Sequence, residues 1–213
     1  MFEVTTAWPR RPNFFTYWAR TTARKCSVSI LFASRNPETR KKAEGSGPGT
    51  GFLADVCRGW EAEADRARDF GLRVIKMRVG FVLGKVGGAL AQMLPVFRAG
   101  VGGRLGSGRQ WMPWIHVDDV AELFTFAIKN DVSGVWNAAS PGPVRNSDFT
   151  AQLAAATHRP ALIPAPRFLL KLVFGELAQH MLDSARVVPD GPVKAGFRFR
   201  FPELGPALVD LAR

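Results

Sequence analysis

Glycine-rich turns are the first residues whose spacing suggests chemistry, because backbone amides in such turns can bind dinucleotide phosphates where a strand meets a helix. Gly100, Gly102 and Gly106 form G-x-G-x-x-x-G, but an expected helix precedes them and no helix start follows. We therefore expect this stretch to be a loop that shapes a substrate-side cleft. The glycine-rich turn at 84–88 lies between an expected strand and an expected helix. It suits an anion better, although it lacks the full dinucleotide spacing.

A second set of residues has the types found in hydrolytic and metal sites. Ser107, His116 and Asp118 resemble the components of a nucleophilic triad, and His116, Asp118 and Asp119 resemble metal ligands. The chain has no G-x-S-x-G nucleophile elbow. Both aspartates also suit the first turn of a helix, where the helix dipole favours carboxylates. We expect neither a hydrolase nor a metal site, and no catalytic residue is assigned.

Tyrosine is the third residue type that could perform chemistry. A tyrosine can transfer a proton to or from a hydroxyl or carbonyl group when a lysine four residues later lowers its pKa. The chain has one tyrosine, Tyr17, and the residue four positions later is Thr21. No Tyr-x-x-x-Lys pair exists in the chain.

Helices and strands that would position such residues are evident from residue 52 onward. The apolar stripe of 52–70 predicts an amphipathic helix that ends at Gly71. The β-branched stretch 72–83 predicts one largely buried strand, and 88–99 predicts a helix that Pro95 kinks. A helix, a glycine and a strand in this order indicate half of a crossover unit, and hence a parallel sheet covered by helices.

Further along the chain, local signals predict another helix and shorter elements. Asp119 and Glu122 have the spacing of a capping box before an apolar helix face. Residues 135–138 predict a short strand, and Asn146 is a plausible N-cap for the next helix. Alternating phenylalanine and arginine at 197–201 predict a strand with one buried face.

Composition limits the classes of protein to consider. The formal net charge is +11, but residues 1–44 hold nine Lys or Arg against three Glu, so more than half of the excess lies there. Nucleic acid is therefore not the expected partner. No apolar run reaches the about eighteen residues that cross a bilayer. Cys26 and Cys57 form neither a disulfide framework nor a zinc motif. We expect a cytoplasmic protein without a membrane partner.

Three segments are expected. Residues 1–44 read as an atypical, basic and poorly ordered segment with one possible strand at 28–32. The segment has the composition of an organelle transit peptide, and a wrong start or a shifted reading frame would explain it equally well. Residues 45–150 read as half of a nucleotide-binding domain, and 151–213 as a C-terminal module.

Several stretches carry a resemblance to a known superfamily. They are RVGFVLGKVGGAL (78–90), GSGRQWMPWIHVDDVAELFTFAI (106–128) and GVWNAASPGPVRNSDF (134–149), which resemble the second half of the extended short-chain dehydrogenase/reductases, the NAD-dependent epimerase/dehydratase superfamily. GFLADVCRGWEAEADRA (51–67) and AGFRFRFPELGPALVDL (195–211) resemble its atypical, epimerase-like branch. The resemblance implies an α/β fold, a partial Rossmann-like parallel sheet with helices, plus a small α+β C-terminal module on the substrate side.

The resemblance also implies departures from typical members. These bind NAD or NADP at an N-terminal Gly-rich turn, which nothing upstream of Gly45 matches. Their catalytic Tyr and Lys correspond to Leu53 and Cys57, neither of which transfers protons in this way. Their substrate arginine corresponds to Met112, which argues against a nucleotide-sugar substrate. We expect a truncated chain, or one with a non-native N-terminus, that has no redox or epimerase activity of its own.

The resemblance finally implies which residues contact ligands. The cofactor-side residues, beside the nicotinamide ring of NADP or NAD in full-length relatives, are Arg78, Val79, Gly80, Phe81 and Val82. The substrate-side residues are Arg98, Arg109, Gln110 and Trp111, where guanidinium groups can bind an anionic group. A packing role for them remains open, the substrate and oligomeric state are not predicted, and the alternative function is a non-catalytic binding module for an anionic partner or nucleic acid.

Overall fold

Three parallel strands form the central sheet of the chain. The computed structural model describes residues 26–32, 41–42, 44–45, 52–161 and 184–213, with the backbone alone at 26–32, 41–42 and 52–53. Strands β1 (Cys26–Phe32), β3 (Arg73–Val79) and β7 (Gly134–Ala138) are hydrogen-bonded in the order β1-β3-β7. The strand predicted at 28–32 is thus confirmed and extends to Cys26. Tyr17 lies outside the described residues.

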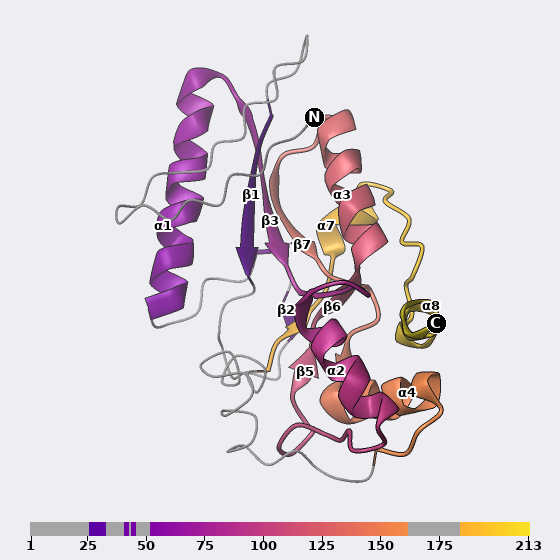
Figure 1. Cartoon of the computed structure of the whole chain (residues 1–213). Coiled ribbons are helices and arrows are strands. Elements are labelled where there is room, and N and C mark those ends of the chain that lie inside the picture. The colour runs from indigo at the N-terminus through magenta and orange to yellow at the C-terminus, as the bar shows by residue number, and fades with distance from the viewer. Residues whose placement is uncertain (1–25, 33–40, 43, 46–51, 162–183) are drawn as a thin grey trace.

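The three strands end at the same level. Phe32 pairs with Val79, and Val79 pairs with Ala138, so the carboxyl ends of all three strands meet at one edge (Figure 1). The expected α/β fold with a Rossmann-like parallel sheet is confirmed. This edge faces the lower part of the molecule in Figure 1, where the shorter strands lie.

One helix covers each face of the sheet. Helix α1 (Phe52–Arg66), with the 3-10 turn η1 (Ala67–Phe70), packs against β1 and β3 and ends at Gly71, whose φ is 70°. Helix α3 (Val117–Lys129) lies on the opposite side (Figure 1). The side-chain alternation of β3 explains this arrangement, because its odd-numbered residues from Ile75 to Val79 join the apolar core beneath α3. Lys76 and Arg78 instead face the carboxylates of α1.

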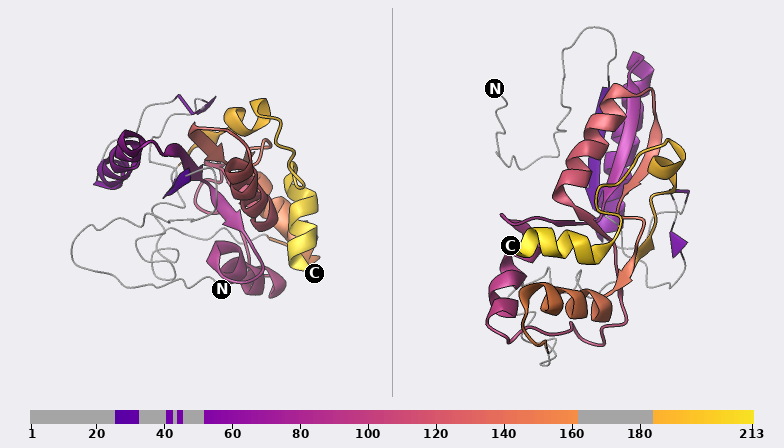
Figure 2. Two further views of the ribbon diagram at one scale, coloured as in Figure 1. Left: turned by 90° about the horizontal axis from the view of Figure 1, so that it is seen from above. Right: turned by 90° about the vertical axis from the view of Figure 1, so that its right-hand side faces the viewer.

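The remaining elements lie beyond the carboxyl edge or beside it. They are β2 (Lys41–Lys42), β4 (Phe81–Leu83), α2 (Gly88–Arg98), β5 (Trp111–Met112), β6 (Trp114–His116), β8 (Val144–Arg145), α4 (Asn146–Thr157), β9 (Arg186–Val187), α7 (Asp190–Lys194) and α8 (Leu204–Ala212). A second core joins α2, α4 and α8 around Trp114 and Phe149, both almost fully buried. Helix α8 lies between α3 and α4 in the right-hand view of Figure 2. None of the described helices has the length and apolar character that a bilayer crossing requires.

The strand predicted at 72–83 is two strands, β3 and β4, separated by Gly80. The Gly80 amide donates to the Ala138 carbonyl at 3.0 Å, whereas the Phe81 amide donates to the Pro113 carbonyl at 2.6 Å. The chain therefore leaves the central sheet at Gly80 and pairs with β6 instead. A Cβ at Gly80 would lie 2.7 Å from the Pro113 oxygen, so this crossing point requires glycine.

Both predicted N-caps are wrong in detail. Helix α3 begins one turn earlier than the predicted capping box, because the His116 side chain accepts from the Asp118 amide at 3.1 Å and serves as its N-cap. Asn146 is the first residue of α4 rather than its cap, and its Oδ1 accepts from the Leu105 amide at 2.7 Å. Local spacing therefore assigned the N-caps of both helices to the wrong residues.

The strand predicted at 197–201 does not form in the structure. The alternation is real, because Phe197 and Phe201 are buried while Arg200 is exposed. The backbone pairs with a side chain instead of a strand, since the amides of Arg200 and Phe201 donate to the two oxygens of Asp119 at 2.7 and 3.0 Å. Asp119 is fully buried, so these bonds tie the C-terminal segment to α3.

Candidate functional site

The loop that follows β3 lies at the edge where the parallel strands end. Ligands of open α/β sheets bind outside the carboxyl ends of the strands, so this edge is the expected place for a cofactor. Gly80 lies directly beyond the pair formed by Val79 and Ala138. Phe81 pairs with Trp114 in the short β4–β6 ladder. The edge is therefore built from the ends of β3 and β7 and from the β4 and β6 strands that cross beneath them.

The five expected cofactor-side residues divide into two kinds. Val79 is buried in the core beneath α3, and Arg78 binds Glu61 of α1 through two hydrogen bonds of 2.9 and 3.1 Å. These two residues therefore attach the covering helices to the sheet. Gly80 provides the crossing point, whereas the side chains of Phe81 and Val82 are half-buried and provide the apolar surface of the loop. The structure therefore brings an uncharged, partly accessible wall to the carboxyl edge.

Hydrogen bonds from three segments fix the shape of this edge. The Ser140 amide, two residues beyond β7, donates to the Trp114 carbonyl at 2.6 Å. The Trp114 indole Nε1 donates to the Gly142 carbonyl at 2.9 Å, and the Ser140 hydroxyl donates to the Pro202 carbonyl at 2.8 Å. These hydrogen bonds connect the edge to the C-terminal segment, and Ser140, which makes two of them, was not among the expected site residues.

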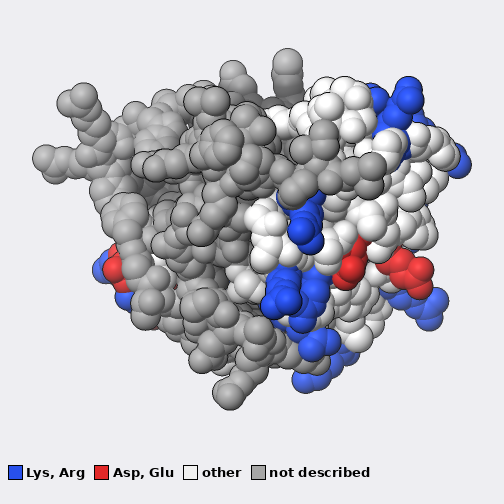
Figure 3. Space-filling model, turned by 90° about the horizontal axis from the view of Figure 1, so that it is seen from below, with Lys and Arg blue, Asp and Glu red and all other residues white. Residues whose placement is uncertain are grey.

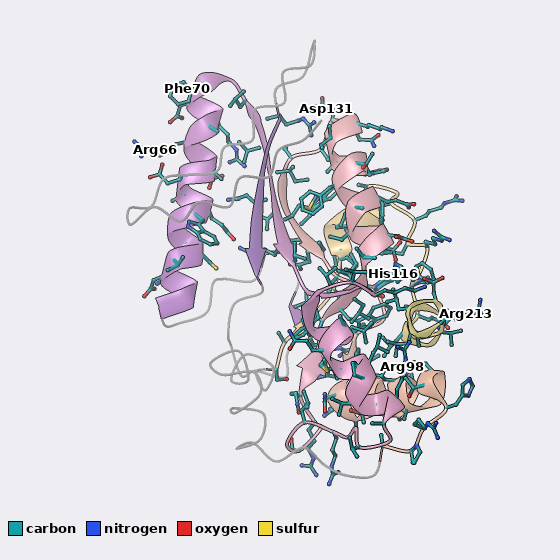
Figure 4. The ribbon with its side chains drawn as sticks, viewed as in Figure 1. Arg66, Phe70, Arg98, His116, Asp131 and Arg213 are labelled. Carbon is teal, nitrogen blue, oxygen red and sulfur yellow. The ribbon has the colours of Figure 1, made fainter. Side chains whose placement is uncertain are left out.

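The residues considered for hydrolysis do not assemble as a triad. His116 is almost fully buried and stacks on Phe201 with ring centroids 4.0 Å apart. Its Nδ1 accepts from the Asp118 amide, whereas a triad histidine donates from Nδ1 to its carboxylate. Its Nε2 lies 3.4 Å from Asp210 of α8, at the junction labelled in Figure 4. The Ser107 hydroxyl accepts from the Arg109 amide in its own loop at 3.3 Å.

The aspartate considered as a metal ligand has other partners in the structure. Asp119 uses both oxygens to bind the amides of Arg200 and Phe201. Within the described ranges, no three His, Cys, Asp or Glu side chains are grouped as metal ligands. His116 and its neighbouring aspartates therefore connect α3 to the C-terminal segment.

Two of the four expected substrate-side residues have packing partners. Arg98 lies at the end of α2, where its guanidinium donates to the Ala212 carbonyl at 2.9 Å (Figure 4). The buried Gln110 donates from its side chain to the Leu105 carbonyl at 2.9 Å. Its own carbonyl accepts from the Asn146 amide at 2.9 Å. Arg98 and Gln110 therefore shape the surrounding structure.

Arg109 and Trp111 belong to a basic cluster that sequence reasoning only partly found. The Arg145 guanidinium lies 4.9 Å from the centre of the Trp111 ring, and that of Arg186 lies 5.0 Å from it. Arg145 also donates to the Arg109 carbonyl at 3.0 Å. Arg145 lies beside Trp111 because β8 pairs antiparallel with β5, and Arg186 lies at the start of β9. Arg186 is far from Trp111 in the sequence, and no local signal could have found it.

Cys57 occupies the position that the resemblance assigns to the catalytic lysine. Its thiol is half-buried in α1. Burial raises the pKa of the Cys57 thiol, Glu61 raises it further, and Arg78 lowers it. The thiol is therefore predominantly neutral at physiological pH and does not supply the positive charge of a lysine. The side chain of Leu53 lies outside the described set.

Comparison with family models agrees with this geometry. Residues 56–139 match the NAD dependent epimerase/dehydratase family, and residues 165–211 match a domain of unknown function, DUF1731. The first match includes the whole of β3, β4, β6 and β7, and hence the carboxyl edge. The second lies in the C-terminal part that the sequence assigned to a separate module.

Individual proteins match most of the chain. The chloroplastic homologue of epimerase family protein SDR39U1 from Arabidopsis thaliana is 43% identical over 172 residues, which are 80% of this chain and 49% of that protein. Epimerase family protein SDR39U1 from Mus musculus is 40% identical over 179 residues, 82% of this chain and 61% of that protein. The chain thus spans about half to three fifths of the length of these relatives.

Solved structures give the same picture. The human epimerase family protein SDR39U1 (isoform 2), solved with NADPH, superposes with a TM-score of 0.81 at 36% identity, over 88% of this chain and 65% of that one. UDP-glucose 4-epimerase from Thermus thermophilus, in complex with NAD, superposes with a TM-score of 0.64 at 18% identity, over 88% of this chain and 64% of that one. The second similarity concerns the fold alone.

Proposed function

Since residues 56–139 belong to the NAD dependent epimerase/dehydratase family, we propose that the carboxyl edge of the sheet is the nicotinamide side of a dinucleotide site. The dinucleotide is NADP(H), because the human relative at 36% identity was solved with NADPH. The observation that carries the proposal is the common end of β1, β3 and β7, which opens onto the Phe81 loop.

The chemistry of the edge fits a nicotinamide ring better than a phosphate. The half-buried side chains of Phe81 and Val82 offer apolar contact to a flat ring. The amides of Gly80 and Phe81 already bind the carbonyls of Ala138 and Pro113. Arg78 is committed to Glu61 and the sheet. The described part of the edge therefore contacts the ring and leaves the pyrophosphate to other groups.

The same site lacks the usual proton-transfer pair at the positions that the resemblance assigns to it. Those positions hold Leu53 and Cys57. A lysine at the second position would lower the pKa of a tyrosine through its positive charge, whereas the raised pKa of Cys57 keeps this thiol neutral. We infer that the chain binds a nicotinamide dinucleotide and an associated small molecule without performing the tyrosine-dependent chemistry of typical family members.

Saturation-transfer difference NMR with NADPH tests this proposal on the full chain. Protein protons at the edge are expected to transfer more saturation to the nicotinamide protons than to the adenine protons, since only the ring contacts the described loop. Equal transfer to both rings, or transfer to adenine alone, would contradict the proposal, as would the absence of any transfer.

A glycine pair supplies the matched variants. Gly80→Ala places a Cβ 2.7 Å from the Pro113 backbone oxygen and must displace the Phe81 loop, so nicotinamide saturation is expected to fall. Gly59→Ala adds the same methyl group on α1, where nothing lies within 4 Å, and is expected to leave the signal unchanged. Circular dichroism establishes whether Gly80→Ala retains its secondary structure. Undiminished nicotinamide saturation in a folded Gly80→Ala protein would place the ligand elsewhere.

A further inference from the structure

Trp111 holds two arginines at one corner of the molecule. The guanidinium carbons of Arg145 and Arg186 lie 4.9 and 5.0 Å from the centre of its ring. The Trp111 backbone is itself anchored, because its amide donates to the Ser184 hydroxyl at 3.1 Å and its carbonyl accepts from the Ala185 amide at 3.4 Å. The backbone of Trp111 is therefore held in place, and its ring contacts two arginines that are distant in the sequence.

A third arginine adjoins this pair through its backbone. Arg145 donates to the Arg109 carbonyl at 3.0 Å, which keeps the two residues adjacent, and the Arg109 side chain is exposed. We call Arg109, Trp111, Arg145 and Arg186 the arginine corner. The like charges of Arg145 and Arg186 lie over the same ring and repel each other, and repulsion of this kind is relieved when an anion binds between them.

The arginine corner has no internal counter-charge. Among the described side chains, no carboxylate forms an ion pair with Arg109, Arg145 or Arg186. Elsewhere in the described part, carboxylates do accompany the cations of α1 and β3, as Glu61 accompanies Arg78 and Asp65 accompanies Lys76. The face seen from below in Figure 3 also carries more Lys and Arg than Asp and Glu in its described part.

The guanidinium group has the geometry that oxyanions require. A guanidinium that lies over an aromatic ring keeps its N–H donors on its rim, where they can bind two oxygens of one phosphate or carboxylate. Arg145 is half-buried and Arg186 is exposed, so the corner is open to solvent but partly shielded from it. Such a site strengthens an anion contact more than a fully solvated lysine would.

The corner also lies close to the proposed nicotinamide edge. Trp111 is two residues before Pro113, whose carbonyl accepts from the Phe81 amide at 2.6 Å. Two residues span at most about 7 Å, so the two places are neighbours along the backbone. We propose that the arginine corner binds an oxyanion group, phosphate or carboxylate, of the small molecule that the nicotinamide edge receives. In this respect the proposal rests on the proposed function.

Isothermal titration of the full chain at low ionic strength tests the anion site directly. Pyrophosphate is the probe for phosphate chemistry and malonate is the probe for carboxylate chemistry. Saturable binding of pyrophosphate alone would assign the corner to a phosphorylated substrate. Binding of malonate alone would assign it to a carboxylate substrate, and binding of both probes would assign it to either oxyanion. Saturable binding of neither probe would overturn the proposal.

Three arginine variants separate a specific site from the general attraction of a basic protein. Arg145→Ala and Arg186→Ala are each expected to raise the dissociation constant of the probe about tenfold or more, because each removes charge-assisted hydrogen bonds. Arg159→Ala removes the same charge from an exposed position just beyond the end of α4 and is expected to change the dissociation constant by less than about twofold. An equal loss in all three variants would mean that net charge alone attracts the probe, which would overturn the proposal.

The conservative variants and the loop variant complete the test. Arg145→Lys and Arg186→Lys keep the charge but lose the planar fork, so they are expected to bind more weakly than the wild type. Full affinity in both would contradict a guanidinium-specific site. Gly80→Ala, which disturbs the nicotinamide edge, is expected to bind the probe as the wild type does. The proposal of the anion site and the proposal of the nicotinamide site can therefore be refuted independently.

Discussion

Cations have opposite surroundings at two places in this chain. Where α1 packs on β3, Lys76 and Arg78 lie 2.8 and 2.9 Å from the carboxylates of Asp65 and Glu61. At the arginine corner, Arg145 and Arg186 lie against an aromatic ring, and no carboxylate in the described residues pairs with them. The first pair of cations therefore stabilises the fold, whereas the second pair leaves its hydrogen-bonding capacity for a ligand.

Glu61→Gln should produce the largest effect on stability, because it removes the charged acceptor of two Arg78 hydrogen bonds at a site where both side chains are only about a fifth exposed. We expect the free energy of unfolding to fall by about 2–3 kcal/mol, somewhat below the value for a fully buried pair. Urea denaturation followed by circular dichroism measures it. Glu63→Gln is the control, since its pair with Arg66 is exposed and contributes about 0–1 kcal/mol. Similar losses in both variants would remove the distinction.

Lys76→Met should have a smaller effect in the same measurement. The Lys76 ammonium lies on the buried face of β3, but its partner Asp65 is 39% exposed and can be solvated when the ammonium is lost. Methionine also fills much of the space of the lysine stem, so we expect a loss of about 1 kcal/mol. Lys85→Met, at an exposed position, is the control. A gain of stability in Lys76→Met would contradict a structural role for the charge.

The smallest expected effect is on the reactivity of the Cys57 thiol, which depends on the charges of Glu61 and Arg78. Because burial and Glu61 raise the pKa of its thiol, alkylation by iodoacetamide should be slow at pH 7.5 and should accelerate only as the pH rises. Glu61→Gln removes one cause of the raised pKa and leaves Arg78, which lowers it, so the rate profile should shift to lower pH. Peptide mapping by mass spectrometry measures the rate at Cys57 alone. An unshifted profile would mean that Glu61 does not affect this thiol.

The sequence predicted the framework of the fold better than the details of its sites. Periodicity in 52–70 and 88–99 predicted α1 and α2 because each helix has a continuous apolar stripe that packs locally. The single strand predicted at 72–83 was wrong, since the break at Gly80 depends on the carbonyls of Ala138 and Pro113, which arrive from distant segments. Local patterns cannot contain that information.

The same limit applies to the candidate site. The resemblance selected Arg109 and Trp111, but nothing near either residue pointed to Arg186, which β9 supplies from the C-terminal part. Asp119 was predicted as a helix cap because its spacing to Glu122 is a local signal. Its actual partners, the amides of Arg200 and Phe201, lie about eighty residues later in the chain. Long-range backbone partners decide the role of a polar side chain, and spacing does not reveal them.

If the arginine corner serves a ligand rather than the fold, the urea midpoint of the Arg145→Ala/Arg186→Ala double variant should depend on pyrophosphate differently from that of the wild type. Without pyrophosphate, the double variant should unfold close to the wild-type midpoint, since a cation–π contact that is open to solvent contributes only about 0.5–1 kcal/mol. With pyrophosphate, the wild-type midpoint should rise, because a ligand that binds the native state stabilises it, and the variant midpoint should not. A variant that unfolds far below the wild type without pyrophosphate, or that retains the full rise with it, would contradict the account.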